Sequence, residues 1–141
     1  MRRILIVDDV PLGRDAIARL LRQEGYRTTV ARNGTEALLK LKEQTPDLIL
    51  LDNMMPEVDG LTFLSGIRRF PKWRDLPVMM LTGNRDKTAQ RQAEALKVAD
   101  YIVKAELTPR EILQRINGYF STAAARQPAA VPDQVRLIND R

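Results

Sequence analysis

The sequence predicts an α/β fold in which a parallel sheet of five strands carries helices on both faces. Five short apolar runs alternate along the chain with segments of helical periodicity, which is the pattern of such a sheet. Three of the runs are continuously apolar, as expected of strands that are buried on both faces. The predicted strands are residues 4–7, 28–31, 48–51, 78–81 and 101–103.

A helix is predicted after each strand. The first follows from apolar residues at helical spacing between the first two strands, with Gly25 as a stop signal. These residues are Leu12, Ala16, Ile17, Leu20 and Leu21. The second helix begins after the turn signal of Asn33 and Gly34 and ends before Pro46. The third is predicted over about residues 61–69.

The last two helices differ in character. The fourth, over about residues 87–96, offers only three alanines and one leucine to a core, so we expect it to be the most mobile. The fifth opens with Thr108, Pro109 and Glu111, which combine a capping box with proline at the first helical position. From residue 121 the composition shifts to Ala, Pro and Gln. We therefore expect one domain over residues 1–120 and a flexible, Ala/Pro-rich tail over residues 121–141, of which residues 122–132 are linker-like.

Composition excludes several kinds of chemistry. The 141-residue chain has no cysteine and no histidine, which excludes disulfides, thiol catalysis, histidine metal ligands and serine–histidine catalysis. The apolar run at residues 4–7 is too short for a signal peptide or a membrane span, so we expect a cytoplasmic protein with no membrane span. The net charge of +5 is spread over scattered arginines without interleaved aromatic residues, and nucleic-acid binding is therefore not expected.

Polar groups follow four of the predicted strands. They are Asp8 and Asp9 after the first, Asp52 after the third, Thr82 after the fourth and Lys104 after the fifth. Each alone has an ordinary explanation as a turn former, a strand end or a solvated cation. Because the carboxyl ends of parallel strands meet at one edge of a sheet, the whole set should lie together. The set predicts a site for phosphoryl transfer to a carboxylate.

Each group has a role in such a transfer. Asp52 can act as the nucleophile and form an acyl phosphate. Asp8 and Asp9 supply the hard oxygen ligands that suit Mg²⁺, which neutralises charge on the transferring phosphoryl group. The Lys104 ammonium and the Thr82 hydroxyl can contact phosphate oxygens.

Four segments resemble, in order and spacing, the receiver domains of response regulators in two-component systems, the chemotaxis-regulator-like family. They are residues 4–9 (ILIVDD), 48–60 (LILLDNMMPEVDG), 77–83 (PVMMLTG) and 100–104 (DYIVK). The resemblance covers about residues 3–120 and implies a flavodoxin-like, doubly wound sheet of strand order 2-1-3-4-5 with five helices.

The resemblance also implies residue roles. Asp52 matches the phosphoacceptor. Asp8, Asp9, Asp52 and the backbone carbonyl of Met54 match the magnesium ligands. Lys104 matches the family's lysine, and Thr82 and Tyr101 match the switch residues.

In that family a histidine kinase or phosphotransfer protein donates the phosphoryl group, which fits a chain without histidine. Phosphorylation is expected to move Thr82 and Tyr101 and to change the face formed by the fourth helix, fifth strand and fifth helix. A downstream protein, or a second copy in a homodimer, would bind that face. We expect a signalling domain, not an enzyme beyond self-phosphotransfer and autodephosphorylation, and a stand-alone receiver with no effector domain.

Two positions depart from the family pattern. Val98 and Ala99 replace the usual Gly-Ala, a packing variation. Ala105 stands where the family has a proline joined to the lysine by a cis peptide. A cis bond before alanine costs about 2.5 to 4 kcal/mol, so the sequence leaves open whether this bond is cis or trans and where the Lys104 ammonium lies.

Two other functions compete with the phosphorylation switch. A docking module would keep the fold without the chemistry, and only Ala105 favours it. A phosphohydrolase of the haloacid-dehalogenase type would need a second acid two residues after the first, where this chain has Val10.

Overall fold

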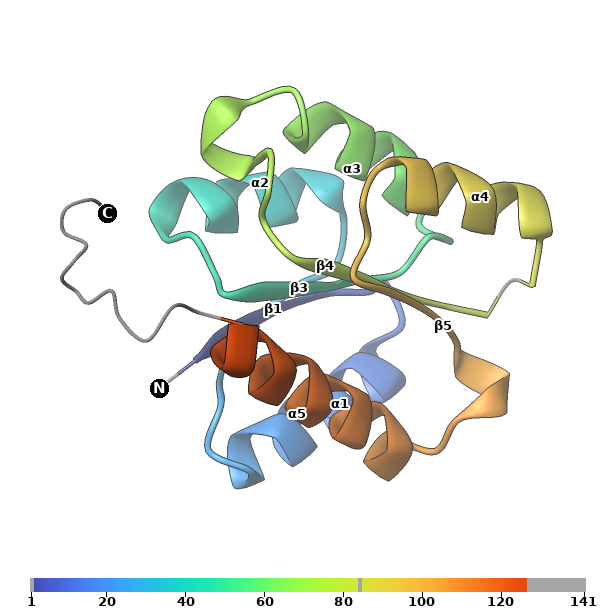
Figure 1. The fold of residues 1–141 in the computed structure, drawn as a ribbon. Helices are drawn as coiled ribbons and strands as arrows, with labels where there is room; N and C mark the ends of the chain where they lie inside the picture. The colour runs from blue at the N-terminus through green and yellow to red at the C-terminus, as the bar shows by residue number, and fades with distance from the viewer. Residues whose placement is uncertain (1, 84, 127–141) are drawn as a thin grey trace, which may run out of the picture.

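The computed structural model describes residues 2–83 and 85–126, in which five parallel strands form one sheet of order β2-β1-β3-β4-β5 (Figure 1). The strands are β1 (Arg3–Val7), β2 (Arg27–Ala31), β3 (Leu48–Leu51), β4 (Val78–Thr82) and β5 (Asp100–Val103). The predicted fold class and strand order are confirmed, and each strand lies within one residue of its predicted bounds.

Helices cover both faces of the sheet. They are α1 (Pro11–Gln23), α2 (Gly34–Glu43), α3 (Gly60–Ile67), α4 (Lys87–Ala95) and α5 (Pro109–Arg126), with short 3-10 helices at Pro71–Trp73 and Lys104–Glu106. Helices α1 and α5 lie on one face, and α2, α3 and α4 on the other (Figure 1). Alternate strand residues divide between two cores: Ile4 and Ile6 pack with α1 and α5, whereas Leu5 and Val7 pack on the opposite side.

The inner face of α1 differs from the prediction. Leu12 is 84% exposed and Ala16 is also exposed, whereas Ala18 is buried beside Ile17 and Leu21. At about 3.6 residues per turn, the buried stripe of this helix passes through position 14 in the first turn and misses position 12. Arg14, whose side chain is 15% exposed, therefore takes the inner position that the apolar pattern had given to Leu12.

The capping box of α5 is confirmed. The Thr108 backbone N–H donates to Glu111 Oε1 at 2.8 Å, and the Glu111 backbone N–H donates to Thr108 Oγ1 at 3.2 Å. The helix continues to Arg126, so residues 121–126 are helical, and the prediction of a linker-like segment over residues 122–132 is wrong for residues 122–126. Their alanines favour helix over linker. The rest of the predicted tail, residues 127–141, lies outside the described residues.

Helix α4 is as polar as expected. Only Ala89 and Ala93 of this helix are buried, and its predicted mobility stays a prediction. Within the described ranges, no helix has the length and apolar character needed to cross a membrane.

Candidate functional site

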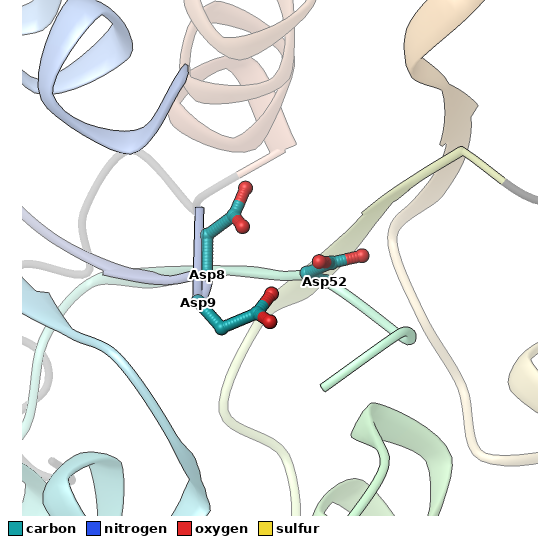
Figure 2. Close-up of side chains that lie close together, drawn as sticks. All are labelled: Asp8, Asp9 and Asp52. Carbon is teal, nitrogen blue, oxygen red and sulfur yellow. The ribbon is translucent and has the colours of Figure 1, made fainter. Parts of the chain in front are cut away.

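The sheet brings the three predicted acids together. Val7 lies opposite Leu51 in the parallel pairing of β1 and β3, so the residues that follow them, Asp8 and Asp52, emerge side by side. Asp8 is 5% exposed and Asp52 4% exposed. Figure 2 shows both carboxylates with that of Asp9, and one oxygen from each lies within 4.8 Å of the other two. This confirms the predicted convergence of Asp8, Asp9 and Asp52 at the carboxyl edge of the sheet.

Lys104 reaches this cluster from β5. Its Nζ lies 2.6 Å from Asp8 Oδ2 and 3.8 Å from Asp52 Oδ2. The peptide bond between Lys104 and Ala105 is trans, and both residues enter the short helix Lys104–Glu106. The chain therefore places the ammonium among the acids without a proline at position 105.

Backbone groups fix the directions of two carboxylates. The Val10 N–H donates to Asp8 Oδ1 at 2.9 Å, and the Met54 N–H donates to Asp52 Oδ1 at 3.1 Å. The Met54 side chain is 59% exposed at the rim of the site. Arg14, which was not predicted, donates from Nη1 to the Asp8 carbonyl oxygen at 3.3 Å. Its position could have been found by extending the buried stripe of α1 by one turn.

Asn53 and Gly60 also shape the site, and neither was predicted to. Asn53 is buried, its Oδ1 accepts the Leu61 N–H at 3.0 Å, and its carbonyl oxygen accepts the Gly60 N–H at 3.0 Å. A Cβ at Gly60 would lie 2.3 Å from the Asp52 carbonyl oxygen. The loop after β3 therefore folds back tightly on the acceptor strand. The sequence carried a signal in the Asp59-Gly60 pair, because Asp59 caps α3 by accepting the Thr62 N–H.

Thr82 and Tyr101 lie on neighbouring strands. Thr82 is fully buried at the end of β4, opposite Val103, and Tyr101 is half-buried on β5, opposite Met80. Since side chains alternate along a strand, Thr82 and Tyr101 both face the side of the sheet that α2, α3 and α4 cover. Burial raises the pKa of the Tyr101 hydroxyl, and the charge of Asp86 raises it further.

The electrostatics of the cluster centre on Asp52. Burial raises the pKa of its carboxyl to about 6; the Lys104 ammonium and the Met54 N–H oppose this rise, while Asp8 and Asp9 add to it. The Lys104 ammonium contacts two of the three crowded carboxylates, those of Asp8 and Asp52, and the three acids together leave an excess of negative charge. Hard oxygen donors with such an excess fit a small divalent cation such as Mg²⁺.

Comparisons with known proteins agree with this geometry. The family model of the response regulator receiver domain matches residues 4–117. The phosphate regulon transcriptional regulatory protein PhoB of Escherichia coli is 32% identical over 136 residues, which cover 96% of this chain and 58% of PhoB. An uncharacterised 14.6 kDa protein of Leptolyngbya boryana is 35% identical over 82% of this chain and 88% of its own length.

Solved structures resemble the fold closely. A CheY-like response regulator receiver domain protein from Methanospirillum hungatei superposes with a TM-score of 0.81 at 25% identity, covering 90% of this chain and 99% of that one. The response regulator TrrA of Thermotoga maritima, solved in complex with Mg²⁺ and BeF, has a TM-score of 0.73 at 33% identity and covers 84% of this chain and 98% of its own. This chain thus spans nearly the whole of these structures but little more than half of PhoB.

Proposed function

The chain belongs to the family of response regulator receiver domains of two-component systems, and on that premise we propose that Asp52 accepts a phosphoryl group from a histidine kinase or phosphotransfer protein. The observation that carries the proposal is the placement of Lys104, whose Nζ lies between the Asp8 and Asp52 carboxylates. An ammonium at this point can contact an oxygen of a phosphoryl group on Asp52.

Asp52 would attack the phosphorus of the donor's phosphohistidine with one carboxylate oxygen. An oxygen–phosphorus bond forms, the phosphorus–nitrogen bond breaks, and its electron pair returns to the donor imidazole. The Met54 N–H, bonded to Oδ1 of Asp52, holds the carboxylate so that the other oxygen, Oδ2, faces Lys104.

Receiver domains bind Mg²⁺ at their acidic pocket, and the donors in this chain fit the ion. We propose that the carboxylates of Asp8, Asp9 and Asp52 and the backbone carbonyl of Met54 hold it. When bound, Mg²⁺ supplies positive charge that offsets the negative charge of the phosphoryl group. The Asp8 carboxylate accepts the Val10 N–H at Oδ1, which orients this donor before the ion arrives.

Thr82 and Tyr101 would carry the effect of phosphorylation to the partner-binding face. A phosphoryl group adds about −1.5 to −2 charge units, and the Thr82 hydroxyl would move to donate to one of its oxygens. Tyr101, on the same side of the sheet, would turn into the space released. The face formed by α4, β5 and α5 would then change and bind a downstream protein or a second copy of the chain.

The docking-module alternative loses its support in this chain. It rested on Ala105, and Lys104 reaches the acids with Ala105 in place. No observation favours a phosphohydrolase, because the position two residues after Asp8 is Val10. Signalling without catalysis of an external substrate is therefore proposed. PhoB is a transcriptional regulator that is longer than this chain, and stand-alone action of this receiver stays a prediction.

Intact-mass spectrometry after treatment with acetyl phosphate and Mg²⁺ tests the acceptor. The wild-type chain should gain the mass of one phosphoryl group, and Asp52→Asn should gain none. Asp75→Asn, which changes an exposed aspartate before β4, is the matched control and should behave as wild type. Phosphate on Asp52→Asn that is labile to mild base would show that another carboxylate is the acceptor.

Lys104→Met is expected to slow phosphorylation by acetyl phosphate about tenfold or more, because a charged hydrogen bond to the phosphoryl group is lost. Mg²⁺ binding should persist, since the ammonium that occupies Asp8 in the free protein is removed. Time-resolved intact-mass spectrometry measures the phosphorylation rate, and calorimetry measures the affinity for Mg²⁺. Lys42→Met on the exposed surface of α2 is the control. A rate equal to wild type would remove Lys104 from the proposed mechanism.

A further inference from the structure

Arg68, directly after α3, binds three backbone carbonyls, two in the connection between α3 and β4 and one at the end of α4. Its Nε donates to the Leu96 carbonyl oxygen at 2.9 Å, and its Nη1 donates to those of Trp73 at 3.0 Å and Leu76 at 2.7 Å. Burial lowers the pKa of this guanidinium, and Asp75 opposes that effect. Charged hydrogen bonds at a part-buried position are the stronger kind, so Arg68 ties these segments firmly together.

One of the three partners ends α4. Leu96 caps the carboxyl end of this helix, and Lys97 follows in the left-handed region with φ of 64°. Elsewhere α4 is held weakly, because only Ala89 and Ala93 are buried. A groove of about 600 Å³ also lies between α3 and α4, lined by residues that include Leu61, Ser65, Gln92 and Ala95. The helix therefore has room beside it and a strong attachment at its last turn.

The other end of α4 follows Thr82 closely in the sequence. Asp86 caps the first turn by accepting the Thr88 N–H at 2.9 Å, and it lies four residues after Thr82. Arg85 forms an exposed ion pair of 3.2 Å with Glu106, close in sequence to Lys104. A change at Thr82 would thus reach the first turn of α4 through a short connection.

We propose that Arg68 is the anchor about which α4 pivots: the first turn moves with Thr82, while the last turn stays fixed to α3 through the Leu96 carbonyl. The proposal rests on the proposed function, because it takes the switch at Asp52 as the source of the movement. Arg68 acts through α4 and is a positioning residue. Loss of the anchor would let the whole helix shift and would weaken the link between the site and the partner face.

Hydrogen exchange of the full chain, with and without Mg²⁺ and beryllium fluoride, tests the pivot. In the wild type, exchange should change at residues 87–91 and stay constant at residues 93–98. In Arg68→Met the change should extend into residues 93–98, whose exchange should also rise about tenfold before any addition. Arg68→Lys, which keeps a donor, should restore part of the wild-type pattern. Arg69→Met, an exposed neighbour on the groove, is the matched control.

The outcomes of this experiment distinguish the proposed pivot at Arg68 from the proposed phosphorylation of Asp52. Equal changes at both ends of α4 in the wild type would overturn the pivot. A rise in exchange spread evenly over α3, β4 and α4 of Arg68→Met would show that Arg68 contributes only to stability. No response at Asp52 and Met54 to beryllium fluoride would count against the proposed function. The comparison of Arg68→Met with wild type without additions would still test the anchor at residues 93–98.

Discussion

Replacing Gly60 with alanine is expected to destabilise the fold by about 3 kcal/mol or more, since backbone must move to admit the methyl group. The new Cβ would lie 2.3 Å from the Asp52 carbonyl oxygen and 2.8 Å from the Asn53 Cα. Both neighbours are backbone atoms at the end of β3, where they cannot turn aside as a side chain would. The substitution should therefore shift Asp52 as well as weaken the fold, and phosphorylation should fall with stability.

Gly66→Ala in the same helix is the matched control for this experiment. Apart from its chain neighbours and the nearby backbone of its own helix, no atom lies within 4 Å of a Cβ at Gly66. Alanine is favoured over glycine inside a helix by about 0.5 to 1 kcal/mol. Urea unfolding of both variants should thus give changes of opposite sign. If Gly60→Ala is as stable as wild type and the NMR amide chemical shift of Asp52 is unchanged, the close approach of Gly60 to the backbone of Asp52 does not constrain the structure.

The sequence predicted most of the sheet because three of its strands, β1, β3 and β4, are short apolar runs that are buried on both faces. It predicted the convergence of Asp8, Asp52 and Lys104 because strand ends in a parallel sheet share one edge. It did not predict Arg14 inside α1, since a long cation with an apolar stem can take an inner helical position that periodicity assigns to leucine. The predicted tail failed at residues 121–126, where helix propensity outweighed a composition typical of linkers.

Other features of the site were beyond sequence reasoning because they depend on packing across the chain. The approach of Gly60 to Asp52 and the contact of Asn53 with Leu61 require the loop after β3 to fold back, and no local pattern specifies that distance. The position of the Lys104 ammonium depended on the backbone at Ala105, which the sequence left open. In the structure this peptide bond is trans and lies within the short helix Lys104–Glu106, and the ammonium contacts Asp8.

Asp52→Asn is expected to stabilise the protein without Mg²⁺ at neutral pH. The folded chain raises the pKa of the Asp52 carboxyl from 3.8 to about 6, so between these values the folded state binds a proton that the unfolded chain has released. Stability from this group is complete below about pH 4 and is lost as the pH rises through about 6. At about 1.4 kcal/mol per pKa unit, ionisation of Asp52 lowers the free energy of unfolding by about 3 kcal/mol. Asparagine does not ionise, so the variant keeps this stability.

Urea unfolding of wild type and Asp52→Asn in a chelating buffer, at about pH 4.5 and about pH 7.5, measures this effect. The advantage of the variant should grow by about 2 kcal/mol between the two conditions, because part of the total loss has already occurred at about pH 4.5. Asp75→Asn, whose side chain is exposed, should show no such growth. Mg²⁺ should recover more stability in wild type than in Asp52→Asn at the higher pH, because the ion offsets the charge that burial disfavours. If the difference in unfolding free energy between Asp52→Asn and wild type is the same at both pH values, Asp52 ionises in the folded protein as it does in the unfolded chain. The surrounding cluster would then not raise the pKa of Asp52.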